Sequence, residues 1–311
     1  MMRYFSMFSG IGGFELGIDR ACNLHRLSSG EEPRKDGHPD IHGRDCSVLE
    51  RNDRGDQAVC VGFSEIDKYA IKIYESHFGG HKNYGDATRI VPESLPDFDL
   101  LVGGFPCQAF SIAGKRLGFE DTRGTLFFDI ARILKVKRPR MFLLENVKGL
   151  LSHDNGRTFK TIITTLAELG YGVEWQVLNS KNHGVPQNRE RVFIVGHLGD
   201  NGGREVFPIG EGDGAVGAEI KRIGHNDIFR RYNQTYDPSG SVESLDTSGG
   251  GGHQPCVPNG ARIRRLTPTE CERLQGYPDG WTAGVSDSQR YKTLGNSVTV
   301  NVIQAIIERM I

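Results

Sequence analysis

The chain has 311 residues, of which 37% are hydrophobic, and its 38 basic residues nearly balance its 39 acidic ones. This length accommodates one large or two modest domains, and the balanced charge gives no global sign of nucleic-acid binding. No apolar run approaches the roughly 20 residues that a transmembrane helix needs, and the first residues enter a predicted strand rather than a secretory signal. The six cysteines lack paired spacings, so we expect a cytoplasmic protein without a disulfide framework.

The first predicted elements are a strand over residues 3–8 and a helix from about Phe14, joined by a turn that contains Gly10, Gly12 and Gly13. Glycines at such a junction let a ligand approach the backbone and the helix N-terminus. Glu15 occupies the position where the dinucleotide-binding fingerprint requires its third glycine. The turn therefore indicates either a ligand site of another kind or only a tight turn.

Residues 24–58 differ from their surroundings, because 14 of these 35 residues are charged and no apolar period is sustained. We predict a flexible surface insertion. His38, His42 and Cys46 are spaced to share one helix face and bind a metal. Pro39 and Gly43 disfavour that helix, so we expect a solvated loop and no metal site.

A second strand is predicted from Val59 to Glu65 and a helix from Ile66 to Phe78. An acid at the end of this strand is where α/β nucleotide sites bind ribose hydroxyls. Glu65 could equally be a first-turn acid that the helix dipole stabilises. Asp86 is a similar acid at the end of a short third segment.

The buried run from Phe98 to Val102 predicts the next strand, which Gly103 and Gly104 end. Pro106 fixes its own φ and biases Phe105 toward an extended conformation, so it presents Cys107 on a stiff arm, at the edge where α/β sheets bind ligands. The thiol is either a nucleophile or an ordinary buried cysteine. The basic, glycine-containing loop over residues 108–124 is typical of an active-site lid.

Helices and strands continue to alternate along the chain. We predict helices over residues 125–134 and 157–169, and strands over residues 139–147, 172–178 and 192–196. This alternation favours an α/β fold with a doubly wound, mostly parallel sheet.

Apolar residues become sparse over residues 197–261, which predicts a small, loop-rich second domain. Basic and aromatic residues are interspersed over residues 220–236, a pattern that suits either a nucleic-acid surface or a solvated face. A capping box at Thr267 and Glu270 predicts a helix start. The last helix, from about Ser297 to Met310, has the apolar spacing of a helix that packs on the core.

Five short motifs stand in one order along the chain. They are Phe8–Gly13, Gly104–Gln108, Glu145–Val147, Gln187–Arg191 and Gly295–Ser297. In this set and order the chain resembles the cytosine-C5 DNA methyltransferases over nearly its whole length. The resemblance implies a Rossmann-like methyltransferase domain over residues 1–196 plus 296–311, a target recognition domain over 197–268 and a connecting hinge over 269–295.

The resemblance implies four catalytic residues. The Cys107 thiolate would add to C6 of cytosine, since C5 alone is too weak a nucleophile to take the methyl group. Glu145 would contact ring N3 and the exocyclic amine, Arg191 would hold O2, and Arg189 would help to order the site. A base inside a duplex cannot reach the thiol, so the cytosine must be flipped out.

The implied methyl donor is S-adenosylmethionine. Its expected binding residues are Phe8, Gly10, Gly12, Gly13, Glu65, Ile66, Asp86, Gly104, Pro106, Leu126, Asn296 and Ser297, with Glu65 at the ribose and Asp86 at the adenine amine. The implied partner is double-stranded DNA, which Gln108, Ser111, Lys115, Arg123, Arg230 and Arg231 are expected to contact. We expect a monomer without membrane contacts that acts separately from any cognate restriction endonuclease.

Departures from the family pattern leave the catalytic groups in place. Ser6 stands where many members carry Asp, and Ile66 stands where an aromatic residue often stacks on adenine. A transfer-RNA methyltransferase of the same fold would carry Cys-Phe-Thr, but Val257 and Pro258 follow Cys256. A catalytically silent DNA-binding homologue would have lost Cys107 or Glu145, and a nicotinamide oxidoreductase is disfavoured by Glu15.

Overall fold

The structure is a computed structural model. It describes residues 1–28, 58–106, 126–199, 205–210, 222–224, 235–237, 239–245, 255–259 and 262–311. Most of the predicted insertion, including His38, His42 and Cys46, lies outside these ranges. So do Cys107 and the predicted lid.

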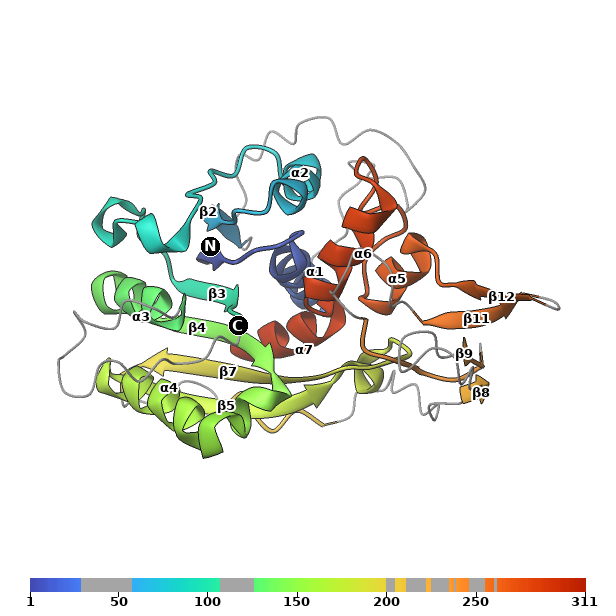
Figure 1. Ribbon diagram of the computed structural model, residues 1–311. Coiled ribbons are helices and arrows are strands. Elements are labelled where there is room, and N and C mark those ends of the chain that lie inside the picture. Colours follow the sequence, from blue (N-terminus) through green and yellow to red (C-terminus); the bar gives the residue numbers. More distant parts are fainter. Residues whose placement is uncertain are drawn as a thin grey trace.

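A six-stranded sheet in the order β2-β1-β3-β4-β7-β5 forms the centre of the molecule, and the strands follow this order from top to bottom in Figure 1. The strands are β1 (Arg3–Met7), β2 (Val59–Ser64), β3 (Leu100–Gly104), β4 (Met141–Val147), β5 (Tyr171–Asn179) and β7 (Glu190–Leu198). The neighbours from β2 to β4 pair in parallel, and β7 runs antiparallel to both β4 and β5. The predicted doubly wound, mostly parallel sheet is confirmed.

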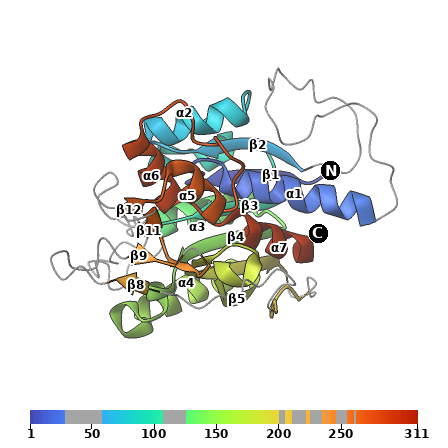
Figure 2. The ribbon, with the colours of Figure 1, turned by 90° about the vertical axis from the view of Figure 1, so that its right-hand side faces the viewer.

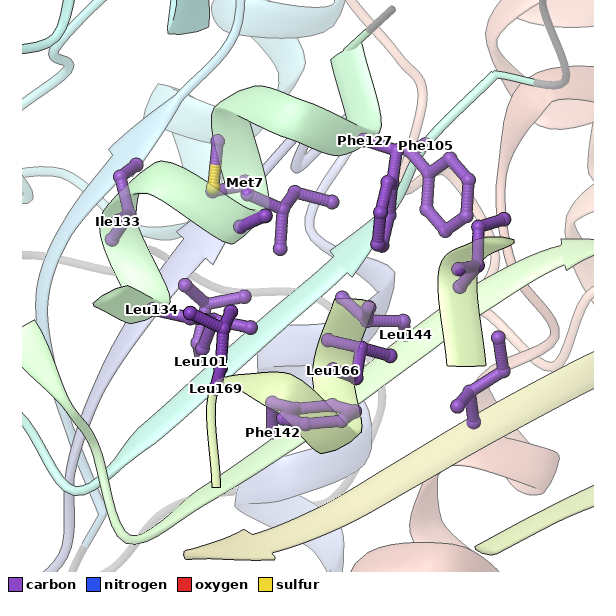
Figure 3. Packing of buried hydrophobic residues seen from close by; sticks show 14 of the residues in the cluster. Met7, Leu101, Phe105, Phe127, Ile133, Leu134, Phe142, Leu144, Leu166 and Leu169 are labelled. Carbon is purple, nitrogen blue, oxygen red and sulfur yellow. The ribbon is translucent and has the colours of Figure 1, made fainter. Parts of the chain in front are cut away.

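Successive strand residues point to opposite faces of the sheet and so divide the core in two. On one face, Leu101, Phe142 and Leu144 pack against α3 (Leu126–Lys137) and α4 (Arg157–Glu168), as Figure 3 shows. On the other face, Leu100 and Val102 pack against the helices α1 (Gly13–Ser28) and α7 (Val300–Met310). The latter two helices lie side by side in Figure 2.

The helix boundaries correct three sequence expectations. Helix α1 continues to Ser28, so residues 24–28 belong to it and not to the insertion, because no glycine or proline stands between Gly17 and Gly30. Helix α2 (Lys68–His77) begins after Asp67, whose carboxylate caps the Tyr69 and Ala70 amides. Helix α7 begins at Val300 and not at Ser297, which is still extended.

The described chain also contains several short helices. They are the 3-10 helices η1 (Ala87–Arg89), η2 (Pro92–Ser94), η3 (Lys148–Leu151), η4 (His153–Gly156) and η5 (Ser180–His183), and the α-helices α5 (Pro268–Leu274) and α6 (Asp287–Asn296). The predicted capping box of α5 is confirmed at Thr267 and Glu270. None of the helices in the described ranges is long and apolar enough to cross a membrane.

The region expected to be loop-rich contains strands of its own. Strands β8 (Arg222–Gly224), β9 (Thr235–Tyr236), β11 (Cys256–Asn259) and β12 (Arg262–Arg265) form one small sheet, while β10 (Val242–Glu243) pairs with β6 (Gln187–Asn188). The β6–β10 pair attaches this region directly to the chain that leads into Arg189. These strands are too short for apolar alternation to show in the sequence.

Candidate active site

The turn between β1 and α1 combines an open surface with tight packing. Phe8, Gly10 and Gly12 all have positive φ, at 53°, 56° and 88°. A Cβ on Gly10 would meet no atom within 4 Å, whereas one on Gly12 would lie 2.4 Å from the Phe78 ring and one on Gly13 2.5 Å from the Tyr277 hydroxyl. Gly10 therefore leaves the backbone open to a ligand, and the other two glycines let neighbouring side chains approach.

Glu65 connects this turn to the end of β2. Its Oε2 accepts from the Gly10 amide at 2.9 Å, and its Oε1 accepts from the Ile66 and Asp67 amides at 2.8 Å. The Ile66 side chain is 73% exposed, which is unusual for an isoleucine at the end of a core strand. The Glu65 carboxylate is thus bonded to the glycine turn at Gly10, and the exposed Ile66 follows Glu65 directly in the chain.

Asp86 lies farther along the same edge, directly before η1. Its Oδ1 accepts from the Thr88 amide at 2.9 Å and from the Thr88 hydroxyl at 2.8 Å, and Arg89 lies 3.7 Å from its Oδ2. The Thr88 hydrogen bonds lower the pKa of Asp86. The segment before Asp86 contributes a single bridge, Asn83 to Phe63, rather than the strand end that the sequence suggested.

Gly104 ends β3 beside Glu145 of β4, since the two residues are paired in the parallel ladder. A Cβ on Gly104 would lie 3.1 Å from Glu145 Oε2. Asn146 holds the next residue of the arm, because its Nδ2 donates to the Phe105 carbonyl at 2.8 Å. This described segment ends at Pro106, and Gly104, where the arm toward Cys107 begins, lies against the carboxylate of Glu145.

Glu145 and Arg191 form an ion pair in which Arg191 Nε lies 3.1 Å from Glu145 Oε1. The two side chains are only 11% and 18% exposed, respectively. Burial raises the pKa of Glu145, while the neighbouring guanidinium groups of Arg191 and Arg189 oppose that rise. The site therefore holds a carboxyl that can exchange a proton near a fixed positive charge.

Arg189 is buried, and its side chain donates to groups other than Glu145. Its Nη2 donates to the Gly295 and Ser297 carbonyls at 3.0 and 2.6 Å, and its Nη1 donates to Ser244 Oγ at 3.0 Å. Burial lowers the pKa of Arg189 to about 9, so its guanidinium remains charged at neutral pH. Arg189 thus joins the segment after α6 to the segment that carries β10.

The remaining candidates divide into described and undescribed residues. Leu126 begins α3. Asn296, which is exposed, ends α6, and the hydroxyl of the following Ser297 meets that of Tyr277. Seven candidates lie outside the described residues. They are Cys107, Gln108, Ser111, Lys115, Arg123, Arg230 and Arg231.

No role was expected from the sequence for Asn146 or Trp281, and Glu15 only excluded a dinucleotide-binding fingerprint. Glu15 is fully buried, and it accepts from the Tyr74 hydroxyl at 3.2 Å. Trp281 donates to the Ile11 carbonyl at 2.9 Å. Asn146 could have been suspected from its place in the Glu-Asn-Val motif, but nothing in the local sequence around Glu15 or Trp281 distinguishes a residue that supports a site.

The family model for C-5 cytosine-specific DNA methylases matches residues 2–223 and 219–311. This chain belongs to that family. The predicted enzyme class, a DNA cytosine-C5 methyltransferase, is thereby confirmed. Similar curated proteins include the Type II methyltransferase M.NgoBI of Neisseria gonorrhoeae, 44% identical with 98% of this chain and 92% of the relative covered. M.HhaI of Haemophilus parahaemolyticus is 35% identical over 98% of this chain and 93% of its own length.

Solved structures show the same fold at low sequence identity. The Dnmt2 methyltransferase of S. pombe is 20% identical with a TM-score of 0.67, and the match covers 99% of this chain and 98% of that one. A putative DNA modification methyltransferase from an E. coli prophage has a TM-score of 0.67 at 19% identity, again with 99% and 98% covered. The Rossmann-like methyltransferase fold expected from the motifs is confirmed.

Proposed function

We propose that this protein transfers a methyl group from S-adenosylmethionine to C5 of a flipped-out cytosine in a short DNA sequence, through a covalent bond between Cys107 and C6. The observation that carries the proposal is the position of the buried Glu145–Arg191 pair beside Gly104. Cys107 follows Gly104 by three residues. The arm between them is held by Asn146, whose Nδ2 donates to the Phe105 carbonyl at 2.8 Å. Family membership fixes the reaction class, and this geometry supports the assignment of roles.

The edge formed by the ends of β1 and β2 suits the methyl donor. Gly10 leaves open space above the backbone, Ile66 offers an exposed apolar surface, and Glu65 offers carboxylate oxygens. Asp86, a half-buried residue farther along that edge, is a second carboxylate acceptor for an exocyclic amine. These features fit an adenosine group, and the donor bound there would supply an electrophilic methyl group.

The chain's own residues would act on the cytosine ring. Addition of the Cys107 thiolate to C6 moves electron density onto N3 and O2 and makes C5 nucleophilic. Glu145, whose pKa burial raises, would give a hydrogen bond or proton to N3, and Arg191 would stabilise the charge at O2. After C5 takes the methyl group, loss of the C5 proton expels the thiolate and restores the aromatic ring.

The region proposed to recognise the target is attached to the chain beside the site through β6 and β10. Strand β10 pairs with β6, and Gln187 in β6 is fully buried between the Leu274 carbonyl at 2.8 Å and the Leu245 amide at 3.0 Å. We assign target recognition to residues 197–268 and a connecting role to residues 269–295. A movement of this region on DNA binding would be transmitted to Arg191 through β6 and the residues that follow it.

A role in transfer-RNA methylation gains no support from the structure. Cys256 is buried in β11, and burial raises the pKa of its thiol, which disfavours a reactive cysteine there. The Type II relatives also favour DNA as the substrate.

Bisulfite sequencing of DNA from cells that produce the protein tests the proposal, with Cys107→Ser as the matched control. The wild type should protect cytosines from conversion in one short sequence context, and the variant should protect none. Unprotected DNA with a folded wild-type protein would contradict the proposed activity. Protection by Cys107→Ser would contradict the covalent route only.

A further inference from the structure

A tryptophan far away in the sequence holds the glycine turn by a second hydrogen bond, in addition to that of Glu65. Trp281 lies between α5 and α6, and its Nε1 donates to the Ile11 carbonyl at 2.9 Å across 270 positions of sequence. Both residues are buried, Ile11 at 1% and Trp281 at 8% exposure. Since Glu65 accepts from the neighbouring Gly10 amide, two side chains from different parts of the chain fix consecutive residues of the turn.

His77, at the end of α2, fixes the indole of Trp281. The two rings are stacked with centroids 3.6 Å apart and an interplanar angle of 8°. His77 Nε2 also lies 2.7 Å from the Trp281 carbonyl oxygen. Because a carbonyl only accepts, Nε2 must carry the proton, so this hydrogen bond selects one tautomer of the neutral ring.

Glu272 in α5 anchors the backbone on both sides of Trp281. It is fully buried, and its carboxylate accepts from the Gly280 amide at 2.7 Å and from the Thr282 amide at 2.8 Å. Arg290 of α6 neutralises it at 3.1 Å. A buried, fully bonded carboxylate of this kind holds a loop in one conformation, so the indole reaches Ile11 from a rigid support.

We propose that Trp281 is a positioning residue for the methyl-donor site and that His77 sets its orientation. The proposal rests on the proposed function, which places S-adenosylmethionine at the glycine turn. The turn contains a non-glycine residue, Phe8, in the left-handed region, a conformation that persists only where the surroundings enforce it. Releasing the Ile11 carbonyl would let the turn relax and weaken donor binding, while Glu145 and Arg191 on the base side would be unaffected.

Trp281→Phe isolates the hydrogen bond, because phenylalanine still stacks on His77 but has no N–H group. We expect this variant to raise the dissociation constant and the KM for S-adenosylmethionine about tenfold, the effect of losing one buried hydrogen bond. The KM for DNA and the kcat at saturating donor should stay within about twofold of the wild type, since uniform binding is lost rather than transition-state stabilisation. His77→Phe, which keeps a ring but loses the Nε2 donor, should raise the donor KM by about threefold, the lower part of the same range.

Trp175→Phe is the matched control, because it makes the same chemical change on edge strand β5, where Trp175 is 46% exposed and contacts Phe159. Calorimetric titration with S-adenosylmethionine and steady-state kinetics measure all three variants. Unchanged affinity for S-adenosylmethionine in Trp281→Phe would overturn the inference. A variant with a lowered Tm and equal increases in the KM values for S-adenosylmethionine and for DNA would overturn it too. A wild type that binds no S-adenosylmethionine would instead contradict the proposed function, and the inference would fall with it.

Discussion

Gly104 and Glu145 are paired across the parallel strands β3 and β4, and the absent side chain of Gly104 leaves the space that the Glu145 carboxylate occupies. The positions of Gly104, where the arm toward Cys107 begins, and of Glu145, proposed to contact N3 of the base, are therefore fixed by one pair of neighbouring strands. In the proposed mechanism, this strand register would set where the arm toward the nucleophile starts relative to the proton donor.

Gly104→Ala should slow methyl transfer. The new Cβ would lie 3.1 Å from Glu145 Oε2, closer than ordinary contact, and would displace the carboxylate. Displacements of this kind reduce kcat by about ten- to a hundredfold. Gly149→Ala is the control, since a Cβ there meets no atom within 4 Å. Equal kcat values for the two variants in single-turnover assays would show that the close approach is unimportant.

Glu145→Gln should reduce kcat by on the order of a hundredfold, as for other lost electrostatic stabilisers. The amide keeps the size of the side chain but can neither transfer a proton to N3 nor neutralise Arg191. Single-turnover methylation of a labelled duplex measures the effect, and the exposed Glu168→Gln serves as the control. A wild-type rate in Glu145→Gln would remove this residue from the chemistry.

Much of the fold could be predicted from the sequence, because strand and helix signals alternate regularly up to α4. The antiparallel β7 could also have been inferred. Parallel neighbours need a crossover of a dozen or more residues, but only residues 180–189 separate β5 from β7. The error at residues 24–28 arose because charge density was taken as the start of a loop, although no residue there breaks a helix.

The direction of Arg189 could not be predicted. In a strand, Arg189 and Arg191 would share one face, which is the arrangement that the Arg-x-Arg spacing suggests. Strand β7 starts only at Glu190, so Arg189 lies before it and turns into the interior. The contacts of Trp281 with Ile11 and of Glu145 with Arg191 are likewise set by tertiary structure, since each joins distant parts of the chain.

Glu15 should make the stability of the fold depend on pH. Burial raises the pKa of this carboxyl from 4.5 to about 7. The folded state therefore keeps a proton that the unfolded chain releases, so this stabilisation is complete below pH 4.5 and is lost as the pH rises through about 7. Between pH 5 and pH 8 the wild type should lose on the order of 3 kcal/mol that Glu15→Gln, which cannot titrate, retains.

Urea unfolding of wild type and Glu15→Gln at both pH values tests this expectation, and Glu168→Gln again provides an exposed control. The free energy of unfolding should fall between pH 5 and pH 8 by on the order of 3 kcal/mol more in the wild type than in Glu15→Gln. Parallel losses in wild type and Glu15→Gln would show that the buried carboxyl does not titrate in this range.

The covalent bond between Cys107 and C6 is the central claim, and trapping tests it most directly. Release of the enzyme requires loss of the C5 proton, so a duplex with 5-fluorocytosine at the target position should hold the protein after methyl transfer. With S-adenosylmethionine present, the wild type should form a denaturation-resistant complex with this DNA and none with the cytosine duplex. Cys107→Ser should form no complex while still binding the donor. A trapped complex in Cys107→Ser, or none in a wild type that methylates ordinary DNA, would contradict the account.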